Sequence, residues 1–133
     1  MTIKLLDSED DVVTIDEGES SNIIIQFTNG GVAIAKNNLT TLKVTLFDRA
    51  SSTLINARNL QDVLDANNGA VATDGTLTLR LGPLDNIVVS TAMPIGGLEE
   101  HIARFTWTWN DGISTRTGQE EVAFDVKKLA TPV

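Results

Sequence analysis

The chain has 133 residues and a mass of 14.3 kDa, which is enough for one domain with a hydrophobic core. Its net charge of −8 and pI near 4.4 argue against binding to nucleic-acid phosphates, because such binding needs clustered cations. The absence of cysteine excludes disulfides, thiolate metal sites and cysteine nucleophiles. No stretch of about 18 apolar residues occurs, so we expect no membrane-spanning helix.

Acidic residues gather near the N-terminus, where seven lie between Asp7 and Glu19. We expect residues 1–11 to form a solvated acidic arm, in which Asp10 and Asp11 could meet a basic partner. The opening run MTIKLLDSEDD has too short an apolar patch for a secretory signal, so we do not expect secretion.

Alternation of apolar and polar residues predicts most of the strands, because side chains on a strand point to opposite faces in turn. The predicted strands cover residues 12–16, 22–28, 40–48 and 76–81. The stretch 32–38 fits either a loop or an edge strand. Residues 53–57 fit a short partner strand, and residues 85–90 fit either a helical turn or a strand.

The period changes between residues 59 and 69. Leu60, Val63 and Leu64 have the spacing of one or two helical turns, with Asn59 as a possible N-cap. The run Asn67-Asn68-Gly69 could end that helix. We therefore predict one short helical insert here.

The strongest pattern in the chain is a predicted hairpin over residues 101–126. Its first half places Phe105, Trp107 and Trp109 on one face, and its second half alternates in the same way. The run Asn110-Asp111-Gly112 between them suits a hairpin turn, because these residues tolerate positive φ. The tryptophans share their face with Phe105, so we expect them to pack in the core rather than form a sugar-binding platform.

About seven short strands with turn signals between them predict an all-β chain, folded as an immunoglobulin-like antiparallel β-sandwich with one short helical insert. The sandwich would cover residues 12–126 and be followed by a tail over 127–133. Neither the disulfide nor the tyrosine corner typical of antibody domains is possible, because the chain has no cysteine and no tyrosine.

A search for chemistry finds no catalytic constellation. The single histidine, His101, shares a strand face with Glu99, and we expect it to be structural or exposed to solvent. Serine nucleophile elbows and phosphate-binding loops are missing. Asp62, Asp65 and Asn67 precede a glycine but lack the spacing of a calcium loop. We therefore predict no catalytic residue, no metal and no cofactor, and favour a binding or assembly module over an enzyme.

Three stretches resemble small immunoglobulin-like structural proteins of tailed bacteriophages. The run HIARFTWTWNDGISTRTGQEEVAFDVKKL looks like their C-terminal hairpin, and VTLFDRASSTLINARNLQDVLDANNG with GTLTLRLGPLDNIVVS is similar to their middle segment. The resemblance covers residues 40–129. It implies a virion protein, made in the host cytoplasm, that decorates the capsid or joins the neck between head and tail.

The resemblance also implies the partners: major capsid, portal or neck proteins, and other copies of the chain in the assembled particle. It supplies no catalytic residue. A calcium- or carbohydrate-binding β-sandwich is the alternative function, and an enzyme subunit without its own active site is a third. The predicted interaction residues are Asp10, Asp11, Asn110, Asp111, Gly112, Lys127 and Lys128.

Overall fold

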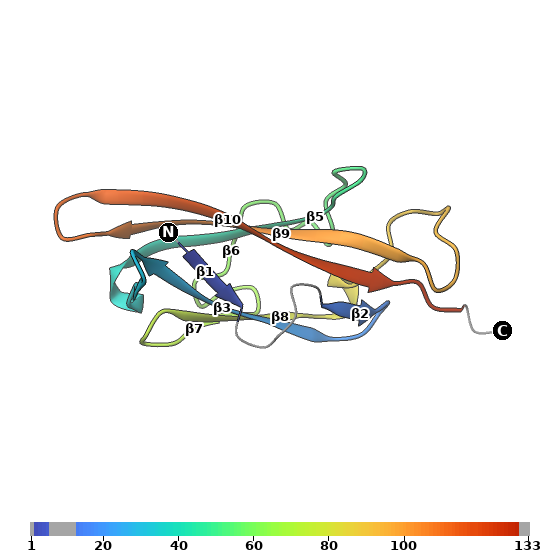
Figure 1. Ribbon diagram of the computed structural model, residues 1–133, viewed down its shortest axis with the longest axis horizontal. Coiled ribbons are helices and arrows are strands. Elements are labelled where there is room, and N and C mark those ends of the chain that lie inside the picture. Colours follow the sequence, from blue (N-terminus) through green and yellow to red (C-terminus); the bar gives the residue numbers. More distant parts are fainter. Residues whose placement is uncertain (1, 6–12, 131–133) are drawn as a thin grey trace.

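Two β-sheets face each other in the computed structural model, which describes residues 2–5 and 13–130 (Figure 1). One sheet has the strand order β1-β3-β8-β7, with β4 also paired to β3. Its strands are β1 (Thr2–Leu5), β3 (Ser21–Asn29), β4 (Val32–Ala33), β7 (Gly69–Val71) and β8 (Thr76–Leu81). The other has the order β2-β10-β9-β5-β6. Its strands are β2 (Thr14–Asp16), β5 (Leu39–Asp48), β6 (Gln61–Asp62), β9 (Leu98–Asn110) and β10 (Thr115–Lys127).

The order of the strands is that of an immunoglobulin-like sandwich. When β1, β3, β5, β7, β8, β9 and β10 take the letters A to G, the sheets read A-B-E-D and G-F-C, as that fold requires. β6 extends the second sheet beyond β5, and β2 joins β10 in the one parallel pairing between described strands. The predicted all-β, immunoglobulin-like sandwich is confirmed.

Side chains from both sheets fill the space between them, with the alternation that the sequence predicts. β3 contributes Ile23, Ile25 and Phe27, and β5 contributes Leu42, Val44 and Leu46. From β9, Trp107 is fully buried and its ring lies 4.7 Å from that of Phe27. The tryptophans are therefore core residues, as expected.

The predicted helical insert is wrong. Residues 60–69 contain β6 and a series of turns, with left-handed φ angles at Leu60, Asp65, Asn67 and Asn68. Tertiary contacts override the local spacing: Val63 is fully buried and its backbone N–H donates to Leu42 of β5. In the described part of the chain, the helices are two 3₁₀ turns, η1 (Lys36–Asn38) and η2 (Pro83–Asp85), and none could cross a membrane.

Three further expectations change at the edges of the sandwich. Thr2–Leu5 forms β1 and pairs with β3, so this part of the expected arm belongs to a sheet. The predicted strand at 53–57 is reduced to one bridge between Phe47 and Leu54. β10 extends through Lys127, and the next residue, Lys128, exchanges backbone hydrogen bonds with Gly96 and Gly97, so the sandwich extends past its predicted boundary at Val126.

Candidate functional site

The turn between β9 and β10 is built by its own side chains. Asn110 accepts a hydrogen bond from the backbone N–H of Gly112 at 2.7 Å, and Gly112 has a φ of +94°. Asp111 Oδ1 accepts from the backbone N–H groups of Ile113 and Ser114, both at 2.9 Å. These N–H donors hold the pKa of the Asp111 carboxyl below its ordinary value. The predicted turn is confirmed at the residues that the sequence indicated.

The hairpin tip reaches past the end of the facing sheet (Figure 1). At the tip, Ile113 is 93% exposed, although it is a large apolar residue. An exposed isoleucine at the most projecting point of a fold is a suitable anchor for a partner surface, because burying it on contact removes apolar area from water.

A groove of about 340 Å³ lies at the base of this tip. It runs between the end of the hairpin, the β3–β4 turn and η1. Its lining is rich in amide and carboxylate side chains and comprises Asn29, Val32, Ala33, Ile34, Asn38, Trp109, Asn110, Asp111 and Gly112. The groove thus brings the predicted turn residues together with two segments distant in sequence. Trp109 is only 6% exposed, so it presents no ring face for stacking a sugar.

The other predicted interaction residues lie elsewhere. Lys127 and Lys128 are at the opposite end of β10 from the tip (Figure 1). Lys127 is exposed, and Lys128 forms an ion pair with Glu17 at 3.5 Å. Asp10 and Asp11 are outside the described residues. The predicted set therefore does not form one continuous surface within the described part of the chain.

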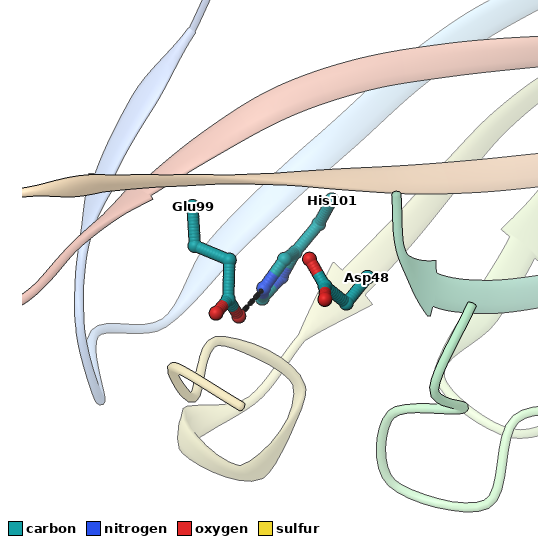
Figure 2. A group of neighbouring side chains, drawn as sticks. All are labelled: Asp48, Glu99 and His101. Carbon is teal, nitrogen blue, oxygen red and sulfur yellow. Dashed lines mark hydrogen bonds and ion pairs between the residues drawn. The ribbon is translucent and has the colours of Figure 1, made fainter. Parts of the chain in front are cut away.

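At the start of β9, Asp48, Glu99 and His101 form a buried polar cluster (Figure 2). The β5–β9 register places Asp48 directly opposite His101. Glu99 Oε1 is 2.7 Å from His101 Nε2, and the Glu99 carboxylate also accepts from the backbone N–H groups of Val89 and Ser90. Of the two expectations for His101, exposure to solvent is wrong, because the ring is fully buried.

Asp48 is the member of this cluster that the sequence reasoning missed. Its signal was present: Asp48 continues the inward series Leu42, Val44 and Leu46, so its parity places a carboxylate between the sheets. Contact with His101 could not be predicted, because it depends on how β5 and β9 align.

A second buried polar network joins loops around η2. Arg58 Nε donates to Asp85 Oδ1 at 2.7 Å and Arg58 Nη2 donates to Oδ2 at 3.1 Å, giving a bidentate ion pair. Asn56 and the backbone N–H of Gly82 donate to the same carboxylate. Because both side chains are buried and hydrogen-bonded between two loops, we interpret the pair as a structural fastening of those loops. No sequence pattern indicated it.

The acidic loop considered for calcium also has a structural role. Asp62 accepts from the backbone N–H of Leu64, and Asp65 accepts from the backbone N–H of Val71 while forming an ion pair with Lys36. The carboxylates are thus used in turns. Among the described residues, the group with the spacing of metal ligands is Asp48, Glu99 and His101.

Comparison with known proteins identifies no family for this chain. No protein-family model matches the chain, and no curated protein does so. Among solved structures, one match is described as murine CRIg. The two sequences are 14% identical, and the alignment covers 96% of this chain and 98% of the matched chain with a TM-score of 0.47.

Proposed function

We propose that the protein is a non-enzymatic structural component of a tailed-bacteriophage virion, attached to the capsid or the head–tail neck. The observation that carries the proposal is the β9–β10 hairpin, which projects from the sandwich and has an open outer edge. β2 covers β10 only from Asp125 to Lys127. From Thr115 to Phe124, β10 pairs with β9 alone among the described strands.

The open edge offers a regular row of backbone donors and acceptors. The N–H of Asp125 points outward, since it donates to Val13 beyond the edge of β10. Because the pairing with β9 is unbroken and directions alternate along a strand, the same outward direction holds for Thr117, Gln119 and Glu121. An extended segment of another chain could add to this edge, a mode that gains affinity from main-chain hydrogen bonds.

The side chains along this edge favour a second copy of the same chain as one such partner. An antiparallel pairing about a two-fold axis at Gly118 places Thr117 opposite Gln119, which aligns the outward-pointing groups. It also places Arg116 opposite Glu120, so each pairing contains two contacts of opposite charge. A register centred on Glu120 would instead set two carboxylates against each other. A homo-oligomer in the assembled particle is therefore part of the proposal.

Particle composition provides the direct test. Virions purified from the host that carries the gene should contain this chain, as measured by quantitative mass spectrometry. A high copy number per virion would indicate capsid decoration, and a copy number that matches a single ring would indicate the neck. Purified virions without the chain would refute the virion role.

A charge swap tests the proposed self-pairing. Arg116→Glu should weaken association between copies, because it sets two carboxylates against each other, and the double variant Arg116→Glu/Glu120→Arg should restore it. Native mass spectrometry and sedimentation of the purified chain would report dimer formation in both variants. Equal association of the wild type and the single variant would contradict the register, and failure of the double variant to recover would do the same.

The alternative is a calcium- or carbohydrate-binding module that uses the tip groove. The amide and carboxylate side chains of Asn29, Asn38, Asn110 and Asp111 favour it, since such groups bind sugar hydroxyls. The buried Trp109 ring counts against it. Glycan-array binding that is lost in Asn110→Ala, or a rise in melting temperature with calcium, would favour this alternative.

A further inference from the structure

The cluster of Asp48, Glu99 and His101 places two carboxyl groups and one imidazole almost out of contact with solvent. The side chains of Asp48 and Glu99 come from adjacent strands, and each residue is 4% exposed. No lysine or arginine in the described part of the chain forms an ion pair with either carboxylate; the nearby Arg49 instead pairs with the more exposed Glu100. Buried charges are ordinarily paired or coordinate metals.

His101 itself is incompletely satisfied. Its Nε2 contacts Glu99, but its Nδ1 has no hydrogen-bond partner and no exposure to solvent. Buried polar atoms in folded proteins nearly always have a partner, so an unpartnered nitrogen in a fully buried imidazole calls for an explanation. Figure 2 shows the imidazole ring lying between the two carboxylates, so that all three side chains converge on one small volume.

We propose that Asp48, Glu99 and His101 bind a divalent transition-metal ion of the Zn²⁺ class. One imidazole nitrogen and two carboxylate oxygens form a donor set that suits such ions, whereas calcium takes six to eight oxygens. One ligand atom from each residue lies within 4.8 Å of the others. Two donors on a tetrahedral zinc ion are about 3.4 Å apart, so side-chain rotations that close the widest separation by up to about 1.4 Å complete the site.

The surroundings supply what a metal site needs beyond its ligands. Val89 and Ser90 hold the Glu99 carboxylate through their backbone N–H groups, and Ser51 Oγ donates to Asp48 Oδ2 at 2.5 Å. Such outer contacts orient ligands. A surface pocket of about 510 Å³ is lined by both Asp48 and Glu99, which gives an ion a route in and leaves room for a water ligand.

The site is independent of the proposed attachment at the hairpin. Its ligands tie the end of β5 to the start of β9, and Glu99 ties that point to the segment before it through Val89 and Ser90. The bound ion would therefore fasten the end of the sandwich opposite the hairpin tip. Because the three ligands come together only in the folded chain, added metal should raise the melting temperature as its concentration increases.

Titration of the tag-free, metal-stripped wild type with ZnCl₂ is the first test. Calorimetry should show a single saturable site, with much weaker binding of Ca²⁺ and Mg²⁺. His101 is the only histidine and the chain has no cysteine, so the imidazole nitrogen signals in a ¹⁵N NMR spectrum belong to this residue alone. Those signals should shift on Zn²⁺ addition. Absence of saturable binding, or imidazole signals that do not move, would overturn the proposal whether or not any variant folds.

Two variants then locate the site. Asp48→Asn keeps the side-chain volume and should lower Zn²⁺ affinity at least about tenfold, because it removes an anionic ligand. Glu100→Gln is the matched control, since Glu100 neighbours Glu99 and lines the same pocket but lies outside the cluster. It should bind Zn²⁺ as the wild type does. Equal losses in Asp48→Asn and Glu100→Gln would place the ion elsewhere and refute the assignment.

Discussion

Replacing Asp85 by asparagine should be among the most damaging isosteric changes in this chain. The Asp85 carboxylate accepts two hydrogen bonds from Arg58, one from Asn56 and one from the backbone N–H of Gly82. The ion-paired side chains of Arg58 and Asp85 are only 4% and 2% exposed. Asp85→Asn keeps the shape but removes the charge, so it leaves a buried guanidinium without its counter-ion.

The size of the effect follows from that burial. Breaking a buried ion pair by removing one partner costs about 3–5 kcal/mol, whereas a surface pair contributes roughly 0–1 kcal/mol. A domain of this size has a total free energy of unfolding of about 5–15 kcal/mol. We therefore expect Asp85→Asn to lose a large part of the stability. Glu121→Gln is the matched control, because it breaks the exposed pair with Arg104.

Urea unfolding followed by tryptophan fluorescence measures the change, since Trp107 and Trp109 are buried in the core and report its loss. The double variant Arg58→Met/Asp85→Leu should be less destabilised than Asp85→Asn, because it leaves no unpaired charge. If Asp85→Asn and Glu121→Gln cost the same, within about 1 kcal/mol, the interpretation of the Arg58–Asp85 pair as a structural fastening would be refuted.

The pH dependence of the same pair has a definite sign. Burial raises the pKa of the Asp85 carboxyl, but the hydrogen bonds from Arg58, Asn56 and Gly82 outweigh it and leave the pKa below its ordinary value. A carboxyl group whose pKa is lower in the folded state than in the unfolded state stabilises the fold when the pH is above the unfolded pKa, which is about 4 for aspartate. This stabilisation is lost as the pH falls through the folded-state pKa. The stability difference between wild type and Asp85→Asn should therefore narrow below about pH 4, as measured by urea unfolding at each pH.

Two further predictions concern the hairpin. Gly118→Ala should destabilise the fold by about 1–3 kcal/mol in urea unfolding, because its Cβ would lie 2.4 Å from the Trp107 indole. Gly82→Ala should be near neutral, because its Cβ would have no atom within 4 Å outside the adjacent residues, and equal effects of the two would contradict the packing argument. Asp111→Ala should speed amide hydrogen exchange at Ile113 and Ser114 and leave the core amides unchanged; unchanged exchange at the turn would show that the Asp111 hydrogen bonds do not hold it.

The parts of the fold that the sequence predicted are those encoded by local alternation. The series Leu42, Val44 and Leu46 and the series Phe105 and Trp107 each identify a buried face without reference to any partner strand. Short strands carry no such signal. β7 has three residues, and it is a strand because it pairs with β8. The same dependence on partners explains the mistaken helix at 60–69, where Val63 is drawn into the core by contact with β5.

The candidate sites divide in a similar way. The turn Asn110-Asp111-Gly112 was predictable, because its residues specify the backbone conformation themselves. Only part of the cluster at His101 could be predicted. Strand parity places His101 and Glu99 on one face, but Asp48 lies 53 positions before His101 and meets it through the register of β5 and β9. Parity alone would have flagged Asp48 as an inward carboxylate, which is a useful signal to seek in other β-sandwiches.

β9 runs between the proposed metal site and the hairpin tip and separates them by its length. Glu99 lies near its start and Asn110 at its end. Because a strand rises about 3.3 Å per residue, roughly 35 Å separates the proposed metal site from the hairpin tip. Sites at that distance with no shared partners are ordinarily additive in their energetics. Loss of metal binding should therefore lower the stability of one end of the sandwich while leaving assembly through β10 intact. An assembly defect in Asp48→Asn that Glu100→Gln does not share would instead show that the two ends are coupled through β9.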